Sequence, residues 1–364
     1  MRRPVDTPFL LVVCALVVFG LLIFTSAALS LLSRGGATFT SVAVSQLLLG
    51  FICGGIALFV LSRIDYRLWR PYTVYFFALS FALTLLTFLP GLGLSLKGAS
   101  RWLAIGPLSF QPEELLKFSA VMLLAALWSN NLRGTHTLRG GLVPLAVVGG
   151  LSVAILLAQP DTAGAMILAA AAAAMLFVAG GSLKHMVSIV LIGVVLVAGA
   201  AAFYPHVRDR IATFVSRSDP QGSGYQVEQS LIAVGSGQLT GRGFGQSIEK
   251  FSYLPEPIGD SIFAVAAEEW GFLGSSVLVL LYGALCVLGL RIAARAGDPF
   301  GGLIAAGLVV IIVGQSLFNI ASILGLVPLV GVPLIFVSHG GTALAISLAE
   351  VGVILSVSRR MRHA

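Results

Sequence analysis

The sequence predicts an all-helical protein that crosses a membrane many times. The chain has 364 residues, of which 57% are hydrophobic and only 10% charged, whereas an ordinary soluble domain carries about a quarter charged residues. Apolar runs long enough to cross ~30 Å of hydrocarbon recur from one end of the chain to the other. These runs are continuous rather than alternating, which excludes a transmembrane β-barrel.

About ten apolar segments are expected to span the bilayer as helices. Their predicted bounds are 9–32, 42–62, 71–89, 112–130, 141–158, 162–180, 185–204, 262–290, 301–324 and 342–358. No soluble stretch is long enough to fold alone, so residues 1–364 are expected to form a single membrane domain. The cysteines Cys14, Cys53 and Cys286 lie inside these spans and are interpreted as small apolar residues.

The distribution of Lys and Arg predicts the orientation. An even number of spans places both termini on one side, and most basic residues lie there: Arg2, Arg3, Arg63, Arg67, Arg70, Arg133, Arg139, Lys184, Arg291, Arg295, Arg359, Arg360 and Arg362. The short loops of the other side hold chiefly Arg34, Lys97 and Arg101. The positive-inside rule then makes both termini cytoplasmic. The net charge of +7 is explained by these loops beside anionic headgroups, and nucleic acid is not an expected partner.

Two polar segments are expected on the outer side. Residues 90–111 mix Gly and Pro with apolar side chains, which suits an interfacial segment anchored by Trp102. Residues 205–261 form a long extracytoplasmic loop between the seventh and eighth spans. Its glycine-rich part, 235–245, suggests tight turns and is interpreted either as a flexible connection or as a loop that cradles a phosphate.

Ionisable groups in spans are expensive and are therefore candidate functional residues. The fourth span begins at Pro112, and Lys117 shares a helix face with both Glu113 and Glu114. Either a structural ion pair or an anion-binding cavity would explain this pattern. Glu350 lies in the middle of the last span and has no evident partner.

Acidic residues gather in 249–269, which holds five of the fifteen Asp and Glu residues. Residues 262–290 are expected to form one helix, ~43 Å long at 1.5 Å per residue, so Asp260 would lie at its outer mouth. The helix N-terminus favours an ionised carboxylate, and both a catalytic base and a helix cap remain open for Asp260. Asp161 is expected to cap the sixth span.

Many short motifs occur together in order along almost the whole chain. They are Arg101-Trp102, Phe110-Gln111-Pro112, Glu114-Leu115-Leu116-Lys117, Gln159-Pro160-Asp161, Tyr225-Gln226, Ser230-Leu231, 241–245, Leu254-Pro255-Glu256 with Asp260, Glu268-Glu269, Asn319, Gly325-Leu326-Val327-Pro328, Gly331-Val332-Pro333-Leu334, and Ser338 with Gly340-Gly341. In these motifs the chain resembles the SEDS glycosyltransferases (shape, elongation, division and sporulation), the FtsW/RodA group. The sequence around Asp260 favours the FtsW branch.

The resemblance implies a peptidoglycan glycosyltransferase that polymerises lipid II at the outer face of the bacterial cytoplasmic membrane and works with a class B penicillin-binding transpeptidase and other divisome or elongasome proteins. It selects Asp260 as the catalytic base. Residues expected to bind substrate are Lys117, Glu114, Arg101, Trp102, Gln111, Arg210, Arg242, Lys250, Glu256 and Ser338. No cofactor is required; Mg²⁺ or Mn²⁺ is an alternative source of positive charge, although no ligand spacing identifies a metal site.

The chain departs from the group at several positions. Glu113 replaces the usual Ser, which makes Glu114–Lys117 the expected ion pair, and His339 replaces the usual Tyr. Thr342, the triplet 257–259, Ser261 and Glu350 are also unusual. Two other functions remain as alternatives: a lipid II flippase or transporter, and a non-enzymatic scaffold for a class B transpeptidase.

Overall fold

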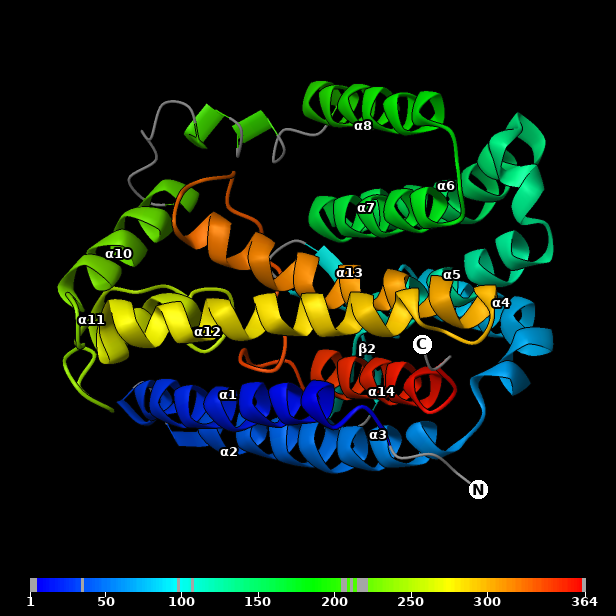
Figure 1. Ribbon diagram of the computed structural model, residues 1–364. Coiled ribbons are helices and arrows are strands. Elements are labelled where there is room, and N and C mark those ends of the chain that lie inside the picture. Colours follow the sequence, from blue (N-terminus) through cyan, green and yellow to red (C-terminus); the bar gives the residue numbers. More distant parts are fainter. Residues whose placement is uncertain are drawn as a thin grey trace.

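The computed structural model shows a bundle of long helices that run along a common direction (Figure 1). It describes residues 5–33, 36–96, 99–105, 108–203, 208–209, 212–214 and 222–361. Six residues that entered the predictions lie outside this part of the chain, namely Arg2, Arg3, Arg34, Lys97, Arg210 and Arg362.

Each of the ten predicted spans falls on helical residues. Eight coincide with one helix each: α1 Thr7–Ser33, α4 Thr73–Leu86, α5 Pro112–Asn130, α7 Thr162–Val178, α8 Leu183–Phe203, α12 Ile262–Ala294, α13 Pro299–Ile323 and α14 Gly341–Ser358. The second comprises α2 Gly36–Val44, the π-helical η1 Ser45–Cys53 and α3 Gly54–Arg63. The fifth comprises the π-helical η4 Leu138–Leu142 and η5 Leu145–Gly149, followed by α6 Gly150–Ala158.

Six helical segments in the described residues are long and apolar enough to cross a membrane. The protein is therefore a multi-pass membrane protein, as predicted, while the count of ten crossings stays a prediction. The two most buried of these segments are α13 and α14, with 78% and 89% of their apolar windows covered by other parts of the protein.

Small residues bring α14 and α3 into close contact. A Cβ on Gly54 would lie 2.9 Å from the Cα of Ala345, and one on Gly352 would lie 2.8 Å from the carbonyl oxygen of Leu58. Close backbone approach at glycines is a usual means of packing helices in membranes, where no hydrophobic effect drives them together. The close packing at these glycines thus joins α3 to α14, whose first residues, Gly341 and Thr342, line the candidate site described below.

Loops rich in arginine meet at one end of the bundle. Arg67 pairs with Asp298 at 2.9 Å, and Arg360 pairs with Asp65 at 2.8 Å, so segments distant in sequence are joined there. The first turn of α1 and the last turn of α14 lie at this end, whereas α10 (Ser223–Ser236) and α11 (Glu249–Ser252) lie at the opposite end (Figure 1).

The segment that was expected to be interfacial contains three β-strands, which the sequence did not predict. The strands β1 Gly93–Leu96, β2 Ala99–Ile105 and β3 Leu108–Phe110 form a three-stranded antiparallel sheet. Trp102 faces Leu94 in the β1–β2 register, and Leu103 faces Phe110 in the β2–β3 register. Side chains alternate between the two faces of β2. The Gly and Pro residues of this segment made that strand pattern hard to recognise in the sequence.

The prediction of one unbroken helix from residue 262 is wrong. Helix α12 breaks at Gly271, whose φ of 66° lies in the left-handed region that favours glycine. The second part of α12 begins with amides that have no partner inside the helix. The Phe272 amide donates instead to the Gln238 carbonyl at 2.8 Å, and the Leu273 amide donates to the Leu239 carbonyl at 3.1 Å.

The same glycine-rich loop caps the first part of α12. The Arg242 amide donates to the Glu268 carbonyl at 3.0 Å, and the Gly243 amide donates to the Glu269 carbonyl at 3.0 Å. A Cβ on Gly241 would lie 2.1 Å from the Glu269 carbonyl oxygen, so only glycine permits this approach. The loop is therefore a structural cap for a broken helix rather than a flexible connection, and the interpretation as a phosphate cradle stays a prediction.

Candidate active site

A cavity of about 500 Å³ lies beside the first turn of α10. Its walls are formed by the start of η1, the strands β2 and β3, the first turn of α10, the turn before α12, the segment between α13 and α14, and the first turn of α14. Among its lining residues are Arg101, Trp102, Gln111, Glu256, Asp260 and His339. Five predicted site residues, Asp260, Glu256, Arg101, Trp102 and Gln111, thus share one cavity.

The turn that carries Asp260 is fixed by the segment that precedes α14. Ser338 Oγ donates to the Gly259 carbonyl at 2.8 Å and accepts from the Leu334 amide at 2.8 Å. The His339 amide donates to the Ile258 carbonyl at 2.7 Å. Two consecutive carbonyls just before Asp260 are therefore held by two consecutive residues from the distant segment.

Two further elements hold Asp260 and its successor. Asn319 on α13 donates from Nδ2 to the Asp260 carbonyl at 2.9 Å and to the Val332 carbonyl at 2.8 Å. Gln226 on α10 donates from Nε2 to Ser261 Oγ at 2.9 Å. The backbone at Asp260 and just before it is thus held by Asn319 and by the segment that precedes α14, and Gln226 holds the side chain of the next residue, so the whole turn is preorganised.

The wall around the Asp260 carboxylate contains an unusual backbone conformation. Glu256 has a φ of 49° although it is not glycine, and its carbonyl accepts from the amides of Gly259 (3.1 Å) and Ser261 (3.2 Å). Such conformations are costly and cluster at functional sites. Across the cavity, a Cβ on Gly331 would lie 3.1 Å from Asp260 Oδ2, so the glycine leaves room beside the carboxylate.

Arg101 supplies positive charge to the same cavity. Its Nε donates to the Gln159 carbonyl at 3.1 Å, its Nη2 donates to the Pro160 carbonyl, and its Nη1 lies 3.5 Å from Asp161 Oδ1. Asp161 also accepts from the Gly164 amide at 3.1 Å, which confirms the predicted cap of α7. Arg101 is the only Lys or Arg among the described residues that line the cavity.

Lys117 lies behind the wall rather than on it. Its Nζ is 2.8 Å from Glu114 Oε2 and donates to Gln315 Oε1 at 2.8 Å, which confirms the ion pair expected from the sequence. Lys117 is 1% exposed. Glu350 is close enough to Glu114 and Lys117 to interact with both charges, so this helix carboxyl belongs to the same buried cluster. The other carboxyl of the α5 first turn, Glu113, accepts a hydrogen bond from Gln111 Nε2.

Lys250 is also buried away from the cavity. Its Nζ lies 2.5 Å from Glu269 Oε1 and donates to Ser26 Oγ at 2.8 Å. Glu269 accepts further hydrogen bonds from Ser26 Oγ (2.6 Å), the Gly245 amide (3.1 Å) and the Ser247 amide (3.4 Å). This carboxylate therefore joins α12 to α1 and to the glycine-rich loop.

The neighbouring Glu268 has a matching role. It accepts from Ser247 Oγ at 2.5 Å and from the Ile248 amide at 3.0 Å, and Arg242 Nε lies 3.5 Å from its Oε1. Glu268 and Glu269 therefore both hold the loop around 245–248 against α12. Neither Arg242 nor Lys250 lines the cavity, and their predicted contact with substrate stays a prediction, as it does for Arg210, which lies outside the described residues.

His339 lines the cavity and packs against α1. Its ring stacks on Phe24 with a centroid separation of 6.3 Å. Nε2 is buried and has no hydrogen-bond partner in the described part of the protein. Burial lowers the pKa of His339, and the nearby Glu256 carboxylate partly opposes that shift.

Sequence reasoning missed several residues that shape the site. Gln226 and Asn319 were part of the motifs but received no role, and Gln315 was not singled out. All three are amides that bridge elements distant in sequence, and only the fold reveals such partners. A buried amide in an apolar helix was the available signal, because buried polar groups need hydrogen-bond partners. Among the described residues, no cluster of three or more His, Cys, Asp or Glu side chains could hold a metal.

The fold and the cavity together define a multi-pass membrane protein with a carboxylate held at one end of its helix bundle. Residues 6–363 match the cell cycle protein family FTSW_RODA_SPOVE. The chain therefore belongs to this family.

Curated relatives are similar in sequence to most of the chain. The chain is 38% identical over 311 residues to "Stage V sporulation protein E" of Bacillus subtilis (strain 168), covering 85% of each protein. It is 36% identical over 318 residues to "Probable peptidoglycan glycosyltransferase FtsW" of Geobacter sp. (strain M18), covering 87% of this chain and 86% of the relative.

Solved structures share the fold over nearly the full length. A chain from a peptidoglycan synthase complex that coordinates polymerization and crosslinking superposes with a TM-score of 0.79 at 25% identity, covering 98% of both chains. The rod shape determining protein RodA of Thermus thermophilus superposes with a TM-score of 0.71 at 26% identity, covering 99% of this chain and 98% of RodA.

Proposed function

We propose that this protein is a peptidoglycan glycosyltransferase that joins lipid II units into glycan strands and releases undecaprenyl diphosphate. The observation that carries the proposal is the Asp260 carboxylate, which faces a cavity of about 500 Å³ and sits on a turn held from three directions. Membership of the FTSW_RODA_SPOVE family and relatives named as glycosyltransferases support it.

In the proposed reaction, Asp260 acts as the general base. The 4-hydroxyl oxygen of the acceptor sugar attacks C1 of the donor sugar, and its proton passes to the Asp260 carboxylate. The bond between C1 and the diphosphate oxygen breaks, and the diphosphate leaves with the electron pair. A single displacement without a covalent enzyme intermediate inverts the configuration at C1, as in glycosidases that use a base to activate the attacking group.

The leaving diphosphate gains charge as the bond breaks, and cations stabilise such charge. Arg101 is the residue best placed for this role, because it lines the cavity and its guanidinium is fixed by the turn at 159–161. Lys117 would act differently: its ion pair with Glu114 fixes the first turn of α5 beside Gln111. A bound Mg²⁺ or Mn²⁺ remains a further source of positive charge at the diphosphate.

We place the cavity on the extracytoplasmic side of the bacterial cytoplasmic membrane, with both termini in the cytoplasm. The support is the cluster of arginine-bearing loops at the end of the bundle opposite to α10, where Arg67 and Arg360 form ion pairs. Basic residues favour the cytoplasmic side in short loops. Lipid II polymerisation requires the opposite, outer face.

A class B penicillin-binding transpeptidase is the proposed partner. The fold is similar over 98% of the chain to one chain of a peptidoglycan synthase complex that couples polymerization to crosslinking. The proposed role is in cell division or elongation. The division branch is the favoured one, and the 36% identity to a relative named FtsW supports it.

The test is polymerisation of purified lipid II by the protein with its transpeptidase partner, followed by separation of the products on a gel. Wild-type protein should yield a ladder of glycan strands, and Asp260→Ala protein should yield none. Equal ladders from both proteins would exclude Asp260 as the base.

The alternatives predict other results in the same system. A scaffold would yield no ladder even with wild-type protein, provided that the transpeptidase partner alone is inactive. A flippase would move labelled lipid II across liposomes and would lose that activity with Asp260→Ala, without forming any glycan.

A further inference from the structure

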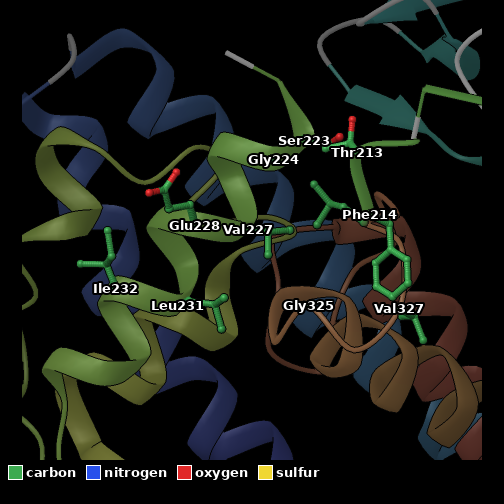
Figure 2. A pocket seen from close by; sticks show the side chains of 11 residues that line it. Thr213, Phe214, Ser223, Gly224, Val227, Glu228, Leu231, Ile232, Gly325 and Val327 are labelled. Carbon is green, nitrogen blue, oxygen red and sulfur yellow. The ribbon is translucent and has the colours of Figure 1, made fainter. Parts of the chain in front are cut away.

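A second hollow lies beside the active-site cavity and is lined mainly by apolar side chains (Figure 2). Its volume is about 470 Å³. One wall is α10, another is the segment that follows α13, and the hollow is also lined by Thr213 and Phe214. Figure 2 shows Val227 and Leu231 of α10 on one side and Gly325 and Val327 on the other. We call this hollow the α10 groove.

The α10 groove is formed by regularly spaced side chains of α10 and by a glycine opposite them. Ser223, Val227 and Leu231 are spaced by four residues and share one face of α10. Opposite them, Gly325 has a φ of 66°, and a Cβ there would lie 3.2 Å from Val227 Cγ1. Any side chain at this position would narrow the groove at its middle.

The α10 groove continues into the active-site cavity. Ser223 and Leu329 line both spaces. The first turn of α10 thus contributes Ser223 and Gln226 to the cavity, while the following turns contribute Val227 and Leu231 to the groove. A molecule bound at Asp260 could therefore extend along α10 without crossing a wall.

The lining indicates what kind of group extends there. Leu231 and Ile232 remain 37% and 47% exposed although they are apolar. No Lys or Arg lines the groove in the described part of the chain, and its one charged residue, Glu228, would repel a diphosphate. The groove therefore suits a hydrocarbon, and the charged part of the same ligand belongs beside Arg101 in the cavity.

We propose that the α10 groove binds the first isoprene units of the polyprenyl chain of the lipid-linked donor. This inference rests on the proposed function, because only a lipid-linked sugar places a hydrocarbon next to the diphosphate. A water occupies ~30 Å³ of liquid, so 470 Å³ holds roughly fifteen heavy atoms of that size. Fifteen carbons correspond to three isoprene units.

The first experiment compares substrates that differ only in chain length. Polymerisation rates are measured for the complex with its transpeptidase, using lipid II with the full polyprenyl chain and an analogue with a single isoprene unit. The variant Leu231→Trp fills the groove away from the cavity. A matched control, Leu79→Trp, makes the same change at a residue on α4 that is 56% exposed.

Leu231→Trp should raise KM for the full-chain substrate by about ten-fold or more and leave kcat/KM for the one-isoprene analogue within about two-fold of wild type. Leu79→Trp should behave as wild type with both substrates. Equal losses with both substrates, or no change with either, would overturn the proposal, since the groove would then be structural or irrelevant to the chain.

The second experiment measures binding without catalysis. A polyprenyl phosphate with a photoreactive diazirine on its third isoprene unit is cross-linked to the protein with and without its bound transpeptidase, and the modified peptides are mapped by mass spectrometry. Cross-links at 223–232 or 325–329 that an unlabelled polyprenyl phosphate competes away support the proposal, even if the wild-type protein makes no glycan. Cross-links confined to other helices, or lost when the transpeptidase is bound, would overturn it; the second outcome would make the groove a seat for the partner.

Discussion

Replacing Ser338 with Ala separates two roles for this hydroxyl, because positioning the Asp260 turn and binding substrate affect different kinetic constants. Ser338 Oγ donates to the Gly259 carbonyl at 2.8 Å and accepts from the Leu334 amide at 2.8 Å. The residue is 4% exposed, and both hydrogen bonds are made within the protein. The structure therefore favours positioning over the substrate contact expected from the sequence.

The size of the effect follows from those two hydrogen bonds. Each contributes roughly 0.5–1.5 kcal/mol, so Ser338→Ala removes about 1–3 kcal/mol of restraint on the turn. If that loss appears in the transition state, kcat falls by roughly 5- to 160-fold, since ~1.36 kcal/mol is a factor of ten. KM should change little, because no substrate contact is removed.

The assay is the initial rate of glycan formation over a range of lipid II concentrations. Ser152→Ala serves as the control, because Ser152 is equally buried and its hydroxyl donates only to the Val148 carbonyl within its own helical segment. That variant should retain wild-type kcat. A ten-fold rise in KM with unchanged kcat for Ser338→Ala would refute the positioning role and restore the substrate contact.

Three further changes test other parts of the structure. Gly271→Ala would place a Cβ 2.3 Å from the Gly241 amide nitrogen at a φ of 66°, so the melting temperature should fall sharply, and a wild-type melting curve would argue against the break in α12. Lys117→Met leaves Glu114 buried without its partner and should cost about 3–5 kcal/mol of stability. The double variant Lys117→Met with Glu114→Gln should recover folding and activity. A double variant that folds but is inactive would indicate that Lys117 binds the diphosphate. Burial holds the pKa of His339 below the ordinary value near 6.5, so the unfolded chain binds more protons than the folded protein as the pH falls below that value. Acidification from about pH 7.5 to 5.5 should therefore lower the melting temperature of wild type more than that of His339→Gln. Equal losses in the two proteins would show that His339 does not cause the pH dependence.

The helices could be predicted well from the sequence, because hydropathy and start signals agree. Helix α5 runs from Pro112 to Asn130, as the proline and the following carboxylates indicated. The break at Gly271 could not be predicted, since a lone glycine in a helical pattern is usually tolerated. Its cause lies in the loop at 237–243, which supplies hydrogen bonds to both broken ends.

The candidate site divides in the same way. Motifs identified Asp260, Glu256, Arg101, Trp102 and Gln111, and the structure brings these five to one cavity. Charge alone could not distinguish Arg101, which lines the cavity, from Lys117 and Lys250, which form buried ion pairs. A cation that binds substrate and a cation that neutralises a buried carboxylate look alike in sequence. Glu350 had no partner until the fold placed its helix beside α5.

The measurement that bears on the catalytic role of Asp260 is the rate of lipid II polymerisation by Asp260→Asn protein, in complex with its transpeptidase and with lipid II binding measured in parallel. The amide keeps the size of the side chain but cannot accept the proton. Loss of a positioned base should lower kcat by about 10²–10⁴-fold while lipid II binding stays within a few-fold of wild type. Polymerisation by Asp260→Asn at close to the wild-type rate would contradict general-base catalysis at this residue.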